Sequence, residues 1–286
     1  TQVLTASGDK TAKIFDVASG KCVTTFDMGN AVEDQQLGCL WQGDFLISMS
    51  LNGVLNYLDP SSGKVARQVF GHNKFVTALS VDSGSKALFS GSYDANIVRW
   101  NYDDASTQIF AGTGHRNQIS ASHLTSDRKL VTAGMDDAVR VTSVASLPLT
   151  YDGSKATGLD APANDVATTP DGSVQIAGTN KSVYVLQNGA VASQTAFAAE
   201  ATAVAVSPAG NEVLVGGRNN IIQRYTLSGG KLTAKDQLTK HRGAITRIAY
   251  SPDGKMFASA DTNRDVIVWD AASGQPKVSD WCYHTS

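Results

Sequence analysis

A short strand-forming pattern recurs along this chain at an interval of about forty residues. Its clearest copy, residues 71–101, opens with Gly71-His72 and contains three runs of β-forming residues, 76–79, 87–90 and 97–100. Gly, Ser, Asp or Asn residues bound each run, which predicts three strands joined by turns. The third run of each copy ends at Asp16, Asp59, Asn101, Ser143, Gln187, Thr226 and Asp270, at intervals of 43, 42, 42, 44, 39 and 44 residues.

A unit of this kind cannot bury both of its faces alone, so it must pack against neighbours like itself. A period near forty, with Gly-His opening the unit and Trp-Asp closing it, is typical of the four-stranded antiparallel blades of β-propellers. The sequence therefore predicts an all-β protein with about seven blades' worth of repeats and with helix limited to single turns. The first copy lacks its first strand, and Tyr283-His284 looks like the opening of a further copy. Both ends predict a chain that is cut from a longer array.

The composition is that of an ordinary globular protein, with 42% hydrophobic and 17% charged residues and a net charge of -2. Nucleic-acid binding needs a basic surface, so this balance argues against nucleic acid as a partner. No window is apolar enough for a membrane span, and the chain does not open on a signal peptide. Cys22, Cys39 and Cys282 are an odd number, lie far apart and form no CxxC pair, which favours reduced thiols in the cytoplasm.

A polar set recurs at fixed offsets within the copies, and it could be mistaken for a catalytic triad. An active site is needed once, however, whereas this set appears in at least three copies, so a buried hydrogen-bond network that holds each blade together is the favoured interpretation. Thr142 replaces the closing Trp in the second of these copies. The predicted network residues are His72, Ser90, Asp94 and Trp100; His115, Thr132 and Asp136; and His241, Ser259, Asn263 and Trp269.

No spacing of His, Cys or acidic residues fits a metal site, and no Gly-rich phosphate loop precedes a helix. Asp136-Asp137 falls in a predicted hairpin turn, where a solvated carboxylate pair is the simpler interpretation. The sequence thus predicts a protein without catalytic residues and without a cofactor.

The remaining candidates for function are loops that lie on one face of a propeller, the rim. These are the loops between outer and inner strands and those that close the central hairpins. The predicted rim contacts are Glu33, Asp34, Gln35 and Gln36; Lys74 beside Asn73; Arg116 and Asn117; Arg218 and Asn219; Arg242; and Arg264.

Several stretches together resemble the WD40-repeat family and, within it, the actin-interacting protein 1 family. They are residues 7–17 (SGDKTAKIFDV), 34–42 (DQQLGCLWQ), 55–59 (LNYLD), 112–118 (GTGHRNQ), 136–140 (DDAVR) and 245–260. The stretch DQQLGCLWQ is far more specific than a Gly-His or Trp-Asp dipeptide, whereas residues 146–191 depart from the pattern.

That resemblance implies two seven-bladed propellers in tandem, with residues 1–105 closing the first and residues 106–286 opening the second. One seven-bladed propeller over residues 1–286 is the alternative. It also implies a cytoplasmic, cytoskeletal protein that binds actin filaments and, with cofilin, takes them apart. A scaffold for another complex fits the repeats equally well, and an enzyme would need one cluster of polar groups in the central channel.

Overall fold

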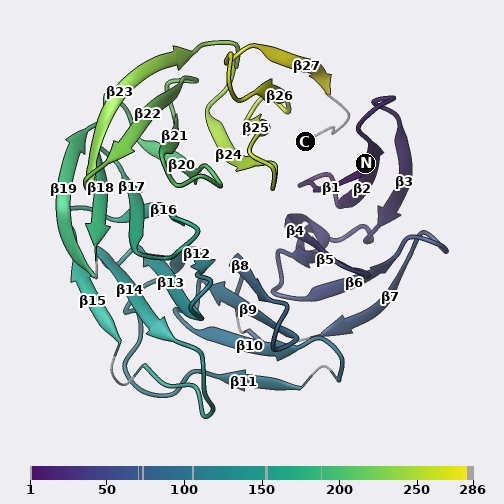
Figure 1. The fold of residues 1–286 in the computed structure, drawn as a ribbon. Coiled ribbons are helices and arrows are strands. Elements are labelled where there is room, and N and C mark those ends of the chain that lie inside the picture. Colours follow the sequence, from purple (N-terminus) through teal and green to yellow (C-terminus); the bar gives the residue numbers. More distant parts are fainter. Residues whose placement is uncertain are drawn as a thin grey trace. The chain divides into compact units, whose positions relative to one another are not determined.

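The structure, a computed structural model, describes residues 2–69, 71–72, 74–104, 106–151, 154–187 and 189–281. Within these ranges every regular element is a β-strand except one 3-10 turn, η1 (Val32–Asp34). The strands form seven antiparallel sheets, six with four strands and one with three (Figure 1). The predicted all-β fold of propeller blades is confirmed. Asn73, the expected boundary at Ala105 and the opening of a further copy at Tyr283-His284 lie outside the described residues.

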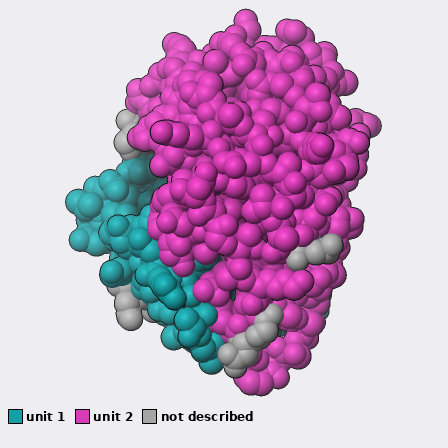
Figure 2. All heavy atoms as spheres, turned by 90° about the vertical axis from the view of Figure 1, so that its left-hand side faces the viewer, with its two compact units in different colours: residues 1–119, 284–286 teal, residues 120–283 magenta. Residues whose placement is uncertain are grey.

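The chain divides between Ile119 and Ser120 into two compact units (Figure 2). The first unit holds three sheets, whose strands follow one another in chain order. They are β1 (Gln2–Ala6), β2 (Thr11–Asp16) and β3 (Cys22–Asp27); β4 (Gln36–Gln42), β5 (Phe45–Ser50), β6 (Leu55–Asp59) and β7 (Lys64–Val69); and β8 (Val76–Asp82), β9 (Ala87–Ser92), β10 (Ile97–Asn101) and β11 (Thr107–Ile109).

The second unit holds four sheets with the same internal order. They are β12 (Ile119–Leu124), β13 (Lys129–Gly134), β14 (Ala138–Ser143) and β15 (Lys155–Gly158); β16 (Ala163–Thr168), β17 (Val174–Thr179), β18 (Ser182–Gln187) and β19 (Ala190–Ala196); β20 (Ala201–Val206), β21 (Glu212–Gly217), β22 (Ile222–Ser228) and β23 (Lys231–Leu238); and β24 (Ile245–Tyr250), β25 (Met256–Asp261), β26 (Val266–Asp270) and β27 (Pro276–Trp281).

Burial differs between strands of one sheet in the way that stacked sheets require. The second strand β9 is buried at every residue, and β8 alternates between buried and half-buried side chains. The outer strand β23 is exposed along most of its length. The hydrophobic core therefore lies between successive sheets: Trp100 of β10 packs with Leu55 and Tyr57 of the preceding sheet, and Trp269 packs with Leu214 of its preceding sheet.

Five first strands carry the same irregularity near their start. The register shifts at the second residue of β4, β8, β16, β20 and β24, where a β-bulge inserts one extra residue. Four polar side chains at this position donate a hydrogen bond to the carbonyl of the first residue of the next sheet's first strand. The donors and acceptors are Thr77 to Ile119, Ser120 to Ala163, Asn164 to Ala201 (3.0 Å) and Thr202 to Ile245 (2.5 Å). Within the second unit, successive first strands are thereby linked side by side.

Candidate functional site

The predicted network of the sheet β8–β11 is assembled from a loop, two strands and a hairpin turn. His72 Nδ1 lies 3.2 Å from Asp94 Oδ2, and His72 Nε2 lies 2.7 Å from Ser90 Oγ. The indole Nε1–H of Trp100 donates to the same hydroxyl oxygen at 2.6 Å. The side chain of His72 is fully buried and that of Asp94 is 9% exposed. The structure thus brings all four predicted side chains together.

Protonation follows from these contacts. Burial lowers the pKa of His72, although the neighbouring Asp94 acts to raise it. A neutral imidazole that donates from Nδ1 to Asp94 leaves Nε2 to accept the Ser90 O–H. Ser90 is itself 0% exposed and lies under the indole. The Ser–His–Asp order is that of a triad, but no substrate can reach this serine in the folded sheet. These hydrogen bonds hold the strands of the sheet together.

The sheet β24–β27 contains a second network, with one change from the prediction. His241 Nε2 lies 2.6 Å from Ser259 Oγ, to which Trp269 Nε1–H donates at 2.8 Å. The carboxylate that accepts from His241 Nδ1, at 3.0 Å, belongs to Asp261 and not to Asn263. The assignment of Asn263 was wrong, because Asp261, at the end of β25, reaches the imidazole. Asn263 is exposed and donates its backbone N–H to Asp261 Oδ1 at 2.8 Å.

The third predicted set lies in the sheet β12–β15. His115 and Thr132 are buried, with 7% and 1% exposure, and Asp136 is half-buried in the hairpin turn. Thr142 occupies the place of the closing indole, and its hydroxyl lies 3.1 Å from Ser154 Oγ. Thr142 lacks the indole N–H, and its contact is longer than the 2.6 Å and 2.8 Å bonds that Trp100 and Trp269 donate.

Gln36, predicted as a rim contact, is instead 2% exposed. Its Nε2 donates to Ser50 Oγ at 2.9 Å, and Asn56 Nδ2 donates to the same oxygen at 2.7 Å. Gln68 then donates to Asn56 Oδ1 at 2.9 Å. The rim assignment of Gln36 was wrong, because this residue is the first of β4 and points into a polar network that sequence reasoning missed. Ser48, which lies 42 residues before Ser90, is also buried and has no hydrogen-bond partner among the described residues.

The other predicted rim residues lie at the surface, exposed or half-buried, and several already take part in local bonds. Arg218 pairs with Glu200 at 2.6 Å, and Arg242 forms two bonds of 3.0 Å with Asp265. Asp34 accepts the N–H of Ala31 at 2.9 Å within the loop. The exposed predicted residues are Glu33, Lys74, Arg116, Asn117, Arg218, Asn219, Arg242 and Arg264, and the half-buried ones are Asp34 and Gln35. This surface is polar and of mixed charge.

Two exposed aromatic residues beside Lys74 were missed by sequence reasoning. Phe75 is 44% exposed and Tyr93 46% exposed, and their rings meet edge to face at 5.9 Å. The Lys74 ammonium lies 5.6 Å from the centre of the Tyr93 ring, within the range of a cation–π contact. Aromatic residues are enriched in protein interfaces. The signal in the sequence was an aromatic residue in each of two adjoining turns, where the repeat needs only small polar residues.

Within the described ranges, no group of three His, Cys, Asp or Glu side chains is placed to hold a metal ion. The only helical element there is the three-residue η1, and no described helix is both long and apolar enough to cross a membrane.

Comparisons with known proteins agree with these repeats. The family described as WD domain, G-beta repeat matches residues 63–101 and 232–270. A chain in the crystal structure of a mitotic checkpoint complex superposes with a TM-score of 0.79 over 92% of this chain and 85% of that one. At 21% sequence identity, that likeness shows the fold alone.

Sequence relatives extend along nearly the whole chain. The 66 kDa stress protein of Physarum polycephalum is 45% identical over 93% of this chain and 44% of its own length. WD repeat-containing protein 1 of Xenopus tropicalis is 38% identical over 96% of this chain and 45% of its own length. Actin-interacting protein 1 of Drosophila melanogaster is 35% identical over 100% of this chain and 46% of its own length. The chain spans less than half the length of these relatives. By its repeats, its blades and its relatives, the chain belongs to the WD40-repeat family.

Proposed function

We propose that this chain is part of a non-enzymatic, actin-binding protein that promotes the cofilin-dependent disassembly of actin filaments. The observation that carries the proposal is the 35% identity to a protein named actin-interacting protein 1 along the full length of this chain. The function places the protein in the cytoplasm, on the actin cytoskeleton. Rigid blades with exposed loops suit a partner as large as a filament, since a stable interface needs area more than a deep pocket.

The tandem arrangement belongs to the same proposal. Residues 1–105 would close one propeller and residues 106–286 would open a second, and the relatives' length, more than twice that of this chain, leaves room for the missing blades. Asp34, Lys74 and Arg116 are among the rim residues that would face a partner. Phe75 and Tyr93 add the exposed aromatic surface that a polar rim lacks.

The test is the severing of single actin filaments, counted by microscopy with cofilin present, with and without the full-length protein. We expect several-fold more severing events with the protein, and no effect when cofilin is omitted. Equal severing in both arms would contradict the proposal and favour a scaffold for another complex.

A double variant tests the aromatic rim within the same assay. Phe75→Ala with Tyr93→Ala should weaken co-sedimentation with cofilin-decorated filaments, because both rings are exposed and neither closes the core. Ile109→Ala is the matched control, since Ile109 is 55% exposed but lies on the outer strand β11. Equal losses in the two variants would remove the aromatic rim from the proposal.

A further inference from the structure

One buried position of the repeat is apolar in every four-stranded sheet but one. It lies on the second strand, opposite the closing residue of the third strand. In five sheets this position holds Leu46, Leu88, Leu130, Val213 or Phe257, each at most 3% exposed. In the sheet β16–β19 it holds Gln175, which is equally buried at 3%. A glutamine at a hydrophobic core position needs an explanation.

The amide of Gln175 is only half satisfied. Its Nε2 donates to the carbonyl of Gly172 at 2.7 Å. Its Oε1 is buried and has no hydrogen-bond partner among the described residues. A buried acceptor without a donor is unfavourable, and nearly all such groups in folded proteins find a partner in the protein, in water or in a ligand.

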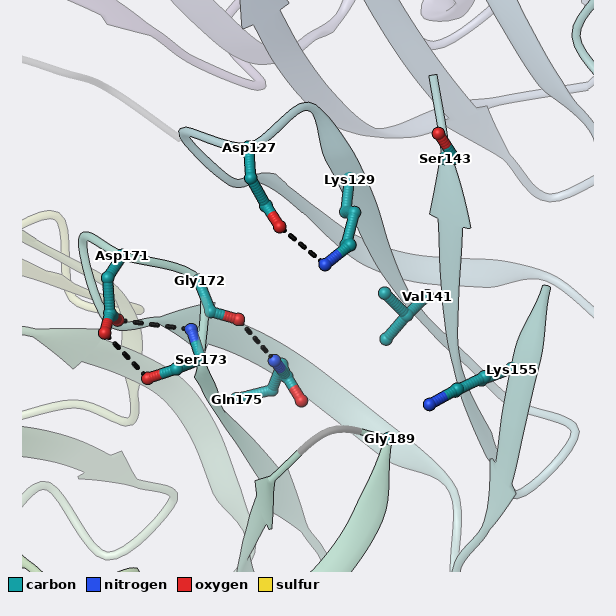
Figure 3. Close-up of a pocket in the computed structure, with 10 residues that line it drawn as sticks. All are labelled: Asp127, Lys129, Val141, Ser143, Lys155, Asp171, Gly172, Ser173, Gln175 and Gly189. Atoms are coloured by element: carbon teal, nitrogen blue, oxygen red, sulfur yellow. Dashed lines mark hydrogen bonds and ion pairs between the residues drawn. The ribbon is translucent and has the colours of Figure 1, made fainter. Parts of the chain in front are cut away.

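Gln175 lines a hollow of about 320 Å³ between the sheets β12–β15 and β16–β19 (Figure 3). In the sheet β24–β27 the corresponding pair, Phe257 and Trp269, fills this level of the core with two rings stacked at 5.9 Å. Here the pair is Gln175 and Leu186, which lacks both rings. The volume of the hollow is that of a small binding pocket.

The charges around the hollow balance. Lys129 pairs with Asp127 at 2.5 Å, and Asp171 accepts from the hydroxyl and the N–H of Ser173 at 2.8 and 3.1 Å. Figure 3 shows the ammonium of Lys155 pointing toward Gln175 across the hollow, which Val141 also lines. Two lysines and two aspartates leave no net charge to attract a strongly charged ligand, while Val141 offers an apolar contact.

We propose that this hollow binds a peptide-type amide, carried by a short uncharged segment of another protein. The N–H of the amide donates to Gln175 Oε1, which supplies the missing donor. The carbonyl of the amide accepts from Lys155, whose ammonium has three N–H groups to share. This site does not depend on the proposed function, because it follows from the position of Gln175 and the space beside it.

The experiment is a titration of the isotope-labelled protein with the blocked peptide N-acetylglycine N-methylamide, followed by NMR. The side-chain amide of Gln175 and the backbone amides of Gly172 and Gly189 should shift together and saturate at millimolar peptide. Sodium acetate, a small anion, should give at least fivefold weaker shifts. Gln175→Leu should fold, because three other sheets carry leucine at this position, and it should bind at least fivefold more weakly.

Gln108→Leu, on the outer strand β11 of another sheet, is the matched control and should bind as the unaltered protein does. The proposal is overturned if no shift saturates, if Gln175→Leu binds the peptide equally well, or if acetate binds in preference to the amide.

Discussion

Gly71 lies against the edge of the Trp100 indole, and a Cβ added to this glycine would overlap the ring at Cη2 and come within 2.9 Å of Cζ2. The indole cannot move away, because it is 1% exposed and its Nε1 is held by Ser90. The glycine of the Gly-His pair is therefore required for space and not for its backbone conformation. The pair and the tryptophan, 28 residues apart in the repeat, form one packing unit.

Gly71→Ala should lower the free energy of unfolding by about 1–3 kcal/mol, as expected for a methyl group forced into a packed core. Urea denaturation measures the change. Gly158→Ala is the matched control, since a Cβ there meets nothing within 4 Å, and it should stay within about 0.5 kcal/mol of the parent. A neutral Gly71→Ala would show that the ring can shift.

Ser48 and Ser90 occupy the same place in adjacent sheets, yet their replacement by alanine should have opposite effects. Ser90 joins His72 and Trp100, so Ser90→Ala should cost about 1–3 kcal/mol. Ser48 has no described partner and lies where Leu58 replaces the tryptophan, so Ser48→Ala removes a buried, unpaired hydroxyl and should be neutral or stabilising. Thermal and urea unfolding of the two variants give the comparison. Equal destabilisation would mean that Ser48 is hydrogen-bonded after all.

Asp261 should matter more to stability than Asp94. It accepts five hydrogen bonds, from His241 and from the backbone N–H groups of Arg242, Gly243, Asn263 and Asp265. Burial acts to raise the pKa of Asp261, but these donors outweigh it and hold the pKa below its usual value.

Asp261→Ala should therefore cost about 3–5 kcal/mol and Asp94→Ala about 1–3 kcal/mol. Asn263→Ala is the control, and since only its backbone enters the network it should change stability by less than about 0.5 kcal/mol. A large loss in Asn263→Ala, with a small one in Asp261→Ala, would restore the sequence-based assignment.

As the pH is lowered, the protein should lose stability before its carboxylates titrate. Burial lowers the pKa of His72 from its usual 6.5, so the unfolded chain binds this proton at a higher pH than the folded chain does. The stabilisation is complete above about pH 7, and it is lost as the pH falls through 6.5 toward the folded value.

Urea midpoints measured between pH 8 and pH 5 check this loss. Burial raises the pKa of Asp165, which has the opposite effect, so the comparison of the parent with His72→Gln isolates the histidine. The variant should lose less stability over this range. A loss of the same size in both proteins would contradict the assignment to His72.

The repeat period was sufficient to place the strands. The predicted ends of the third runs at Asp16, Asp59, Asn101 and Asp270 are the last residues of β2, β6, β10 and β26. Only at Thr226 does the strand, β22, run two residues further, to Ser228. Turn residues and strand-forming runs are local signals, and a repeated unit presents them seven times, so that an ambiguity in one copy is resolved by the others.

The side-chain networks could be predicted only in part, because position in the repeat does not fix which polar atom reaches which partner. Counting along the period aligned Asn263 with Asp94, but the carboxylate two residues earlier lies closer to the imidazole. Gln36 was predicted to lie in a loop because polar residues precede it, although it is the first residue of β4 and its side chain is buried. Nothing in the sequence distinguishes Gln175. Only the strand register shows that the residues at the same position of the other sheets are apolar.

The bonds between successive first strands also bear on how the protein responds to mechanical load. At the bulge of β4 the donor position holds Leu37, which is 43% exposed and cannot form the bond that Thr77 makes from β8. Strands β4 and β8 therefore lack the side-chain hydrogen bond that joins β16 to β20 and β20 to β24. A pulling force applied across these strands should separate the sheets β4–β7 and β8–β11 first.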